Sequence, residues 1–129
     1  MNQPEELAIK VMMMPRETNG QGTIFGGVLL SYIDQAAAVV ARRHAPAQVV
    51  TVAIEKVEFK RPVLVGDLVS FYGKLVRRGR TSLTVDVRVE AERVENESSC
   101  LIDVTQATLV FVCIDERGQP RPLTEPEPT

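Results

Sequence analysis

The spacing of hydrophobic positions changes once along the chain, from a helical period to a period of two. Residues 27–44 lack proline, and the alanines at 36–38 favour helix. Apolar side chains cover most of the circumference of this helix, which is typical of a helix enclosed by other elements. The basic residues Arg42, Arg43 and His44 suit its negative C-terminal end, and an Ala-Pro pair then stops it. The pattern predicts one early, enclosed helix.

Strand-like segments lie on both sides of the predicted helix. They span residues 7–14, 48–60, 68–76, 83–92 and 101–114. In residues 83–92 five apolar side chains alternate with polar ones, so this strand has one dry face and one wet face. Short turns join the later strands, which predicts an antiparallel meander of consecutive strands. The fold class is therefore α+β, with the dry face of a sheet curled around a central helix.

Length and composition predict one soluble globular domain. The chain has 129 residues, of which 44% are hydrophobic and 25% are charged. No linker divides it, so residues 1–129 form a single domain, with a proline-rich, acidic and flexible tail at about 122–129. A net charge of −2 excludes a strongly basic nucleic-acid-binding protein. Neither a membrane-spanning run nor a signal-peptide pattern occurs, so we expect a cytoplasmic protein without nucleic-acid or membrane partners.

The cysteines and the single histidine do not form a reactive or metal-binding pattern. Cys100 and Cys113 lie in strand-like sequence without a CxxC pair, which predicts two buried free thiols. His44 falls at the helix end, ten residues from Asp34, and no ligand partners share a suitable spacing. We therefore predict a helix-cap role for His44 and no metal site.

A glycine-rich loop, "TNGQGTIFGG", comes directly before the helix. It is not a P-loop, because Val28 and Leu29 follow the glycines where that motif needs lysine and then serine or threonine. Its glycine spacing does not fit the dinucleotide fingerprint either, and no parallel crossover follows. Two interpretations remain. The bare backbone can bring N–H groups at a helix N-terminus to a ligand, or the glycines can serve only tight packing of helix on sheet.

Asp34 is the one acid within the apolar helix. Its neighbours one turn away are Leu30, Ser31, Ala37 and Ala38, and none of them is cationic. Burying an unpaired carboxylate costs on the order of several kcal/mol. Asp34 therefore either reaches solvent or a neighbouring backbone group, or is an acid placed beside a cleft for chemistry.

The segment "MPRETNGQGTIFGGVLLSYID" closely resembles the signature of hotdog-fold acyl-CoA thioesterases, in the acyl-CoA hydrolase branch. The resemblance continues through "VVTVAIEKVEFKRPVLVGDLVSFYGKLVRRGRTSLTVDVRV" to "ATLVFVCIDERGQPRPL" and covers nearly the whole chain. It implies a hotdog fold, in which a five-stranded antiparallel sheet wraps one long central helix. It also implies a homodimer whose sheets join edge to edge, with further assembly to a hexamer.

The resemblance also implies catalytic roles. Asp34 matches the family's catalytic acid, which acts as a general base on water or as a nucleophile on the thioester. Asn19 matches the asparagine that lies across the dimer interface from the partner's acid. Gly26 and Gly27 match the turn whose backbone N–H points at the thioester carbonyl. Since each site takes residues from both subunits, we expect the monomer to be inactive.

A site for coenzyme A needs cations for its phosphates. Six candidates form two clusters at predicted strand ends: Lys56, Lys60, Arg61, Arg77, Arg78 and Arg80. Each of them alone is better explained as a solvated surface charge. Together, "KRP" and "RRGRTS" resemble the segments that line the family's nucleotide channel. The resemblance therefore implies these coenzyme A-binding residues: Arg61, Arg78, Gly79, Thr81 and Ser82.

From these features we expect an acyl-CoA thioesterase that releases a free acid and coenzyme A. No cofactor is expected, because coenzyme A is part of the substrate and product. The alternatives are a hotdog dehydratase and a non-enzymatic acyl-CoA-binding regulator. Dehydratases of this fold use a histidine with an acid, and no histidine lies near Asp34 on the helix. A regulator could dispense with Asp34.

Overall fold

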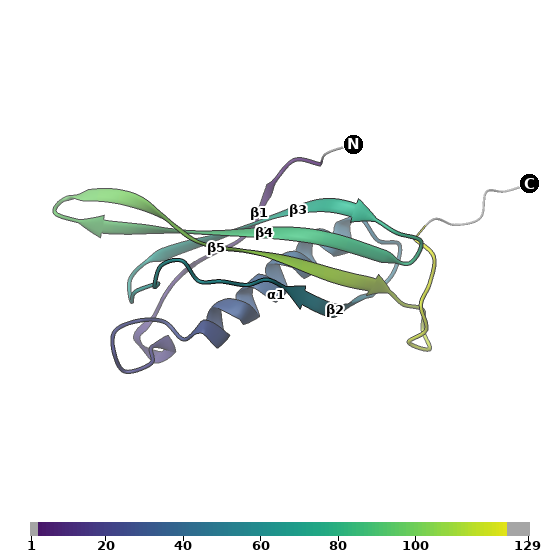
Figure 1. The fold of residues 1–129 in the computed structure, drawn as a ribbon, viewed down its shortest axis with the longest axis horizontal. Helices are drawn as coiled ribbons and strands as arrows, with labels where there is room; N and C mark the ends of the chain where they lie inside the picture. The colour runs from purple at the N-terminus through teal and green to yellow at the C-terminus, as the bar shows by residue number, and fades with distance from the viewer. Residues whose placement is uncertain (1–2, 124–129) are drawn as a thin grey trace, which may run out of the picture.

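The computed structural model describes residues 3–123, which form an antiparallel five-stranded sheet with one helix packed on its inner face (Figure 1). In chain order the elements are β1 (Glu6–Met12), the short 3-10 helix η1 (Pro15–Glu17), α1 (Gly26–Arg43), β2 (Val49–Glu55), β3 (Leu68–Arg78), β4 (Ser82–Glu95) and β5 (Ser98–Cys113). This order confirms the predicted α+β class and the single early helix.

The order of strands across the sheet differs from the prediction at one connection. The order is β1-β3-β4-β5-β2, and each neighbouring pair is antiparallel. Strands β3, β4 and β5 form the predicted meander. Strand β2 pairs with β5 rather than with β3, so residues 56–67 carry the chain from one edge of the sheet back to its far side. The prediction of a meander through all consecutive strands was therefore wrong at this connection. Strand β2 is an edge strand instead.

Strand β2 also ends earlier than the predicted 48–60. Lys56 has a φ of 50°, in the left-handed region, which breaks the extended backbone after Glu55. The following residues run beside β5 without forming a ladder with it. There the Thr105 hydroxyl donates to the carbonyl of Glu58 at 2.5 Å, and the N–H of Lys60 donates to the carbonyl of Val104 at 2.9 Å.

The core lies between α1 and the inner face of the sheet. The predicted dry positions of β4 are all buried: Leu83, Val85, Val87, Val89 and Ala91. The helix comes very close to β3, where a Cβ on Gly73 would lie 2.5 Å from Cγ2 of Val40. The opposite face of α1 is not enclosed, because Ser31, Gln35 and Arg42 are exposed. The prediction of a helix enclosed on all sides is therefore wrong for the single chain.

Backbone hydrogen bonds fix the end of α1 and the last of the described residues. His44 is the C-cap of α1, and its N–H donates to the carbonyls of Ala41 and Arg42, which confirms the predicted capping role. Leu123 is buried, and its N–H donates to the carbonyl of Arg80 at 2.9 Å. Most of the tail predicted at about 122–129 lies outside the described residues, so its flexibility stays a prediction.

Strands β4 and β5 continue past the rest of the sheet as a two-stranded arm, residues 93–101 (Figure 1). Pairing with β3 starts only at Glu92. The base of the arm is held by Arg93, which donates to Asp67 at 2.7 and 2.9 Å, and the rest is held by the ladder between β4 and β5. Its side chains Val94 and Leu101 are 74% and 66% exposed. Val94 pairs with Ser99, two residues from Leu101, so these two apolar side chains share one face of the arm.

The exposed arm also explains the cysteines. Cys113 is buried at the end of β5, as predicted, whereas Cys100 is exposed. The prediction of two buried thiols was wrong for Cys100 because it lies in the arm, where no further strand or helix covers it.

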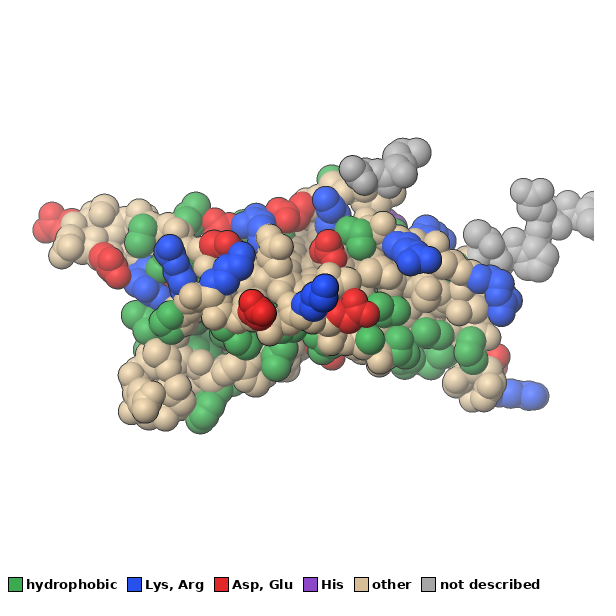
Figure 2. Space-filling view, in the orientation of Figure 1, with side chains coloured by type: hydrophobic (Ala, Val, Ile, Leu, Met, Phe, Trp, Pro, Cys, Tyr) green, Lys and Arg blue, Asp and Glu red, His purple; other side chains and the backbone are tan. Residues whose placement is uncertain are grey.

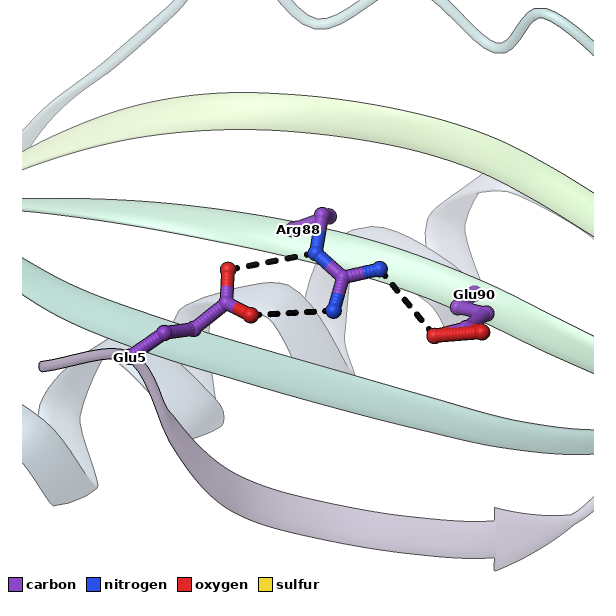
Figure 3. A network of polar contacts seen from close by, with 3 residues as sticks. All are labelled: Glu5, Arg88 and Glu90. Carbon is purple, nitrogen blue, oxygen red and sulfur yellow. Dashed lines mark hydrogen bonds and ion pairs between the residues drawn. The ribbon is translucent and has the colours of Figure 1, made fainter.

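The outer face of the sheet carries charged side chains that tie the segment before β1 to β4 (Figures 2 and 3). The guanidinium of Arg88 donates two hydrogen bonds to Glu5, at 2.9 and 3.1 Å, and a third to Glu90 at 3.0 Å. It also stacks over the ring of Tyr72, 4.4 Å from the centroid. These bonds lower the pKa of Glu5 and raise that of Arg88.

Candidate functional site

Asp34 lies at the middle of α1, on the side that faces the edge strand β2. The hydroxyl of Thr51 on β2 donates a hydrogen bond to Oδ1 of Asp34 at 2.7 Å. Asp34 is half-buried rather than buried. The structure therefore corrects the picture of a buried carboxylate without a partner: the acid stands at the border between helix and sheet edge, and one of its oxygens is held.

Thr51 was not among the residues predicted for the site. The residue is a polar position within the apolar run "VVTVAIE", a pattern that a threonine at a solvated strand position produces equally well. What makes Thr51 part of the site is the placement of β2 alongside α1. A short-range pattern does not contain that placement, so only the three-dimensional structure brings Thr51 to Asp34.

The N-terminus of α1 presents two backbone donors. The helix begins after Phe25 without a side-chain cap. The N–H groups of Val28 and Leu29 donate to the Phe25 carbonyl, while those of Gly26 and Gly27 have no acceptor among residues 3–123. Partial positive charge at a helix N-terminus favours an oxygen that carries negative charge.

Packing within the chain does not require glycine at these two positions. A Cβ on Gly26 would only touch the ring of Phe59, at 3.4 Å, and a Cβ on Gly27 would meet nothing within 4 Å. The structure therefore does not support the interpretation that these glycines serve only tight packing of the helix on the sheet. The bare backbone at Gly26 and Gly27 leaves room for a group from outside this chain.

Asn19 lies in the exposed loop that precedes α1. Its backbone N–H donates to the carbonyl of Thr23 at 2.9 Å, and its side-chain Nδ2 donates to the Thr23 hydroxyl at 2.6 Å. Its Oδ1 accepts the N–H of Gln21 at 2.9 Å. Among the described residues, the hydrogen bonds of Asn19 thus stay inside its own loop. One chain does not join Asn19 to Asp34, and their meeting across a subunit interface stays a prediction.

The predicted coenzyme A residues lie at opposite ends of β3. Arg61 comes before this strand, whereas Arg78 is its last residue, and Gly79, Thr81 and Ser82 follow up to the start of β4. Strand β3 has 11 residues, so at ~3.3 Å per residue its ends are roughly 35 Å apart. One chain therefore does not gather these residues around a single nucleotide.

Arg78 has a second contact that the sequence did not reveal. Its Nη1 donates to the carbonyl of His44 at 3.0 Å, at the C-terminal end of α1. In the adjoining turn, the N–H of Gly79 donates to the carbonyl of Ser82 at 2.8 Å. A Cβ on Gly79 would lie 2.5 Å from Oγ of Ser82, so a side chain there would require the Ser82 hydroxyl to rotate away.

A hollow of about 620 Å³ opens one helical turn beyond Asp34, between the end of α1 and the start of β2. Its lining includes Ala38, Arg42 and Gln48. A second hollow of about 560 Å³ shares Gln48 and continues past Arg117 and the end of β5. Both hollows are lined by residues at the start of β2 or just before it.

The Thioesterase superfamily model matches residues 21–97, from the glycine-rich loop to the arm. The chain belongs to the thioesterase superfamily. The acyl-CoA thioester hydrolase YciA of Salmonella typhimurium is 40% identical to this thioesterase over 124 residues, which cover 95% of this chain and 93% of the relative.

Solved structures share the fold of this thioesterase. A hexameric hotdog fold thioesterase of Campylobacter jejuni matches with a TM-score of 0.88 and 42% identity, over 92% of this chain and 90% of that chain. The acyl-CoA hydrolase of Staphylococcus aureus, solved as an aspartate-to-alanine mutant, matches with a TM-score of 0.79 and 31% identity, over 92% and 71%. The hotdog fold and the family that the sequence resembles are thereby confirmed.

No helix within residues 3–123 is long and apolar enough to cross a membrane. The cytoplasmic location, the absence of a metal site and the absence of a cofactor stay predictions.

Proposed function

We propose that this thioesterase hydrolyses acyl-CoA to a free acid and coenzyme A. The observation that carries the proposal is the Asp34–Thr51 pair, a carboxylate at the middle of α1 that is oriented by a hydroxyl. It occurs in a chain whose relatives are named acyl-CoA thioester hydrolases.

Asp34 supplies the reactive carboxylate. As a general base it takes a proton from a water molecule that attacks the thioester carbonyl carbon, after which the C–S bond breaks and coenzyme A leaves as its thiolate. As a nucleophile, an oxygen of Asp34 attacks the same carbon, the C–S bond breaks, and water then hydrolyses the anhydride. Thr51 holds Oδ1, which leaves Oδ2 for either step.

The Staphylococcus aureus acyl-CoA hydrolase supports roles for both residues. It has been solved as an aspartate-to-alanine mutant and as a threonine-to-alanine mutant. The two mutated positions are 17 residues apart, which is also the separation of Asp34 and Thr51. We therefore take Thr51 as the counterpart of the threonine mutated in that enzyme. In this chain it orients the catalytic acid, so it is the first residue to test.

The backbone N–H groups of Gly26 and Gly27 stabilise the carbonyl oxygen as it gains negative charge. Both are without an acceptor among the described residues, and both stand at the positive end of the α1 dipole. Donors fixed in place before the reaction stabilise a developing oxyanion without reorganisation. Because Asp34 lies roughly two helical turns from these glycines in one chain, the glycine turn and Asn19, which share one loop, both contribute to the site of the partner's Asp34.

The two alternatives fit these residues less well. A dehydratase of this fold would need a histidine with its acid, but His44 caps the far end of α1, ten residues from Asp34. A regulator that only binds acyl-CoA would have no use for a carboxylate held by a hydroxyl at the middle of the helix.

The β2 edge joins two chains into a dimer. Val50, Val52 and Ile54 on this strand are exposed, and Figure 2 shows hydrophobic side chains along the side of the molecule where β2 is drawn in Figure 1. An open edge with apolar side chains is a natural pairing surface. Antiparallel pairing of two β2 strands also sets Arg61 of one chain at the same end of the dimer as Arg78 of the partner subunit.

The arm provides the second contact that a hexamer requires. Dimers assemble into a closed hexamer only through another kind of interface. Val94 and Leu101 form an exposed apolar pair far from the β2 edge, and the neighbours from Campylobacter jejuni and Yersinia pestis are hexameric. Changing both residues to serine should leave dimers, whereas Val52→Lys should leave monomers, as measured by light scattering. A hexameric arm variant would exclude the arm from the interface.

A thiol-release assay with acyl-CoAs of increasing chain length tests the activity. The wild-type protein should release coenzyme A, and Asp34→Asn should lower kcat by roughly 10²–10⁴-fold, the usual contribution of a general base. Asparagine can still accept the Thr51 hydrogen bond, so circular dichroism should show an unchanged fold. Near-normal turnover by Asp34→Asn would remove Asp34 from the chemistry.

A further inference from the structure

The hydrogen bonds of the Asn19 loop decide which way its side-chain amide points. A backbone N–H can be accepted only by the amide oxygen, and the N–H of Gln21 lies 2.9 Å from Oδ1. The nitrogen is therefore the atom that faces Thr23, and it donates to Oγ1 of Thr23 at 2.6 Å. With both atoms engaged, the amide has one orientation, and the second N–H of Nδ2 is the donor left over.

Thr23 is the firmly anchored member of this pair. Its backbone bridges to Leu64, and the next residue, Ile24, is buried and donates its N–H to the carbonyl of Val63 at 2.8 Å. Asn19 instead lies in an exposed stretch that contains Gly20 and Gly22, with φ of +87° and +86°. Glycines restrain a backbone weakly. The Thr23 hydroxyl is thus the link between the Asn19 amide and the rigid part of the fold.

We propose that Thr23 is a positioning residue of the thioesterase reaction: its hydroxyl holds the Asn19 amide so that the remaining N–H serves as a donor to the thioester oxygen. This role rests on the proposed function. The chemistry requires such a donor, because the thioester oxygen gains negative charge during attack. Asp34 is the acceptor of the site, so a residue that meets it from the partner subunit is most useful as a donor.

A set of variants in one thiol-release assay tests this role. Thr23→Val removes the hydroxyl at nearly constant shape and should lower kcat by roughly ten-fold, while KM for acyl-CoA changes little, because a misplaced donor weakens the transition state more than substrate binding. Thr23→Ser keeps the hydroxyl and should recover most of that rate. Thr108→Val is the matched control: it removes a hydroxyl that donates to Asp86 at 2.8 Å on the outer face, and should leave kcat unchanged.

Two further measurements separate positioning from general stability. Single-turnover measurements at high enzyme concentration give the residual rate of Asn19→Ala, and Thr23→Val should not lower that residual rate further, because the group that it positions is gone. Asn19→Asp keeps acceptors for the Gln21 N–H and for the Thr23 hydroxyl but has no N–H, so it should be as inactive as Asn19→Ala. Melting temperatures show that each variant is folded, and Thr23→Ala replaces Thr23→Val if the latter is not.

The outcomes distinguish this role from the proposed function. If the wild type hydrolyses acyl-CoA but Thr23→Val keeps its kcat, or lowers it equally with and without Asn19, the role of Thr23 is wrong and the thioesterase function stands. An active Asn19→Asp variant would overturn the donor role in the same way. If the wild type hydrolyses no acyl-CoA, the proposed function fails, and the role of Thr23 fails with it.

Discussion

The hydroxyl of Thr51, on an edge strand, donates to the carboxylate of Asp34, at the middle of the helix, across 2.7 Å. This bond ties the reactive acid to β2, an edge strand whose outer side is open for pairing. A second chain that pairs with β2 would therefore also close the surroundings of Asp34. Under the proposed β2 pairing, dimer formation would also complete the site.

Removing the Thr51 hydroxyl should impair catalysis without harming the fold. Thr51→Val keeps the β-branched shape that suits a strand, so the melting temperature should stay close to that of the wild type. The loss of a hydrogen bond to a charged group should lower kcat by roughly 10–100-fold. Thr51→Ser, which keeps the hydroxyl, should be much less affected. Steady-state kinetics decide the matter, and full activity of Thr51→Val would show that Asp34 needs no such orientation.

Mixing two inactive variants should restore activity if sites are shared between subunits. Asn19→Ala and Asp34→Ala chains each lack one essential group, but in a hybrid dimer one site contains both wild-type residues. With random exchange about half of the dimers are hybrids with one intact site each, so the mixture should recover about a quarter of wild-type activity. Exchange is verified by native mass spectrometry. An inactive mixture with proven exchange would mean that each chain builds its own site.

Arg61 and Arg78 should respond differently to replacement by alanine. Both changes should raise KM for acyl-CoA and leave kcat similar, because phosphate contacts bind substrate and transition state alike. Only Arg78→Ala should also lower the melting temperature, since its guanidinium donates to the His44 carbonyl at the end of α1. Thioesters that lack the nucleotide should be hydrolysed equally by wild type and variants. An equal loss with both substrates would place these arginines outside the nucleotide site.

The Glu5–Arg88 ion pair should make a small, acid-sensitive contribution to stability. The hydrogen bonds from Arg88 lower the pKa of Glu5 below its usual 4.5. A carboxyl with a lowered pKa stabilises the fold above its unfolded pKa, and the effect is lost as the pH falls through the folded value. Glu5→Gln should thus lower the melting temperature at pH 7. The matching loss in the free energy of unfolding should be less than about 1 kcal/mol, because the pair is partly solvated.

Below pH 4 the difference between wild type and Glu5→Gln should shrink toward zero. Calorimetry between pH 3 and pH 7 follows it, with Glu97→Gln in the exposed β4–β5 turn as the control. A difference that does not change with pH would mean that charge on Glu5 is not its source.

The helix and the meander could be predicted because their signals are local. The alternation through Val85 and Val87 reports the two faces of β4 directly, and the proline-free segment with its alanines reports α1. The partner of β2 could not be predicted this way, because the same β-branched run can pair with β3 or with β5. The exposure of Cys100 was missed for a similar reason: its ladder is regular, but the rest of the sheet stops short of it.

Site residues divide along the same line. Asp34 was conspicuous as an acid in an apolar helix, whereas the roles of Asn19 and Gly26 came from family resemblance. The roles of Thr51 and Thr23 could not be predicted from the sequence. Each role depends on a hydrogen bond, from Thr51 to Asp34 and between Thr23 and Asn19, that only the fold brings about. Such contacts depend on how segments are placed, and hydrophobic spacing does not record that.

The contact between Gly73 and Val40 sets a rule for how this family can diverge. No side chain fits at position 73 while valine fills position 40, because the first added carbon would lie 2.5 Å from Cγ2. Both positions are buried, and Val40 follows Asp34 on the same helix, so shifting α1 away from β3 would displace the acid from Thr51. Related sequences with a side chain at position 73 should therefore have a residue smaller than valine at position 40, and the two positions should vary together.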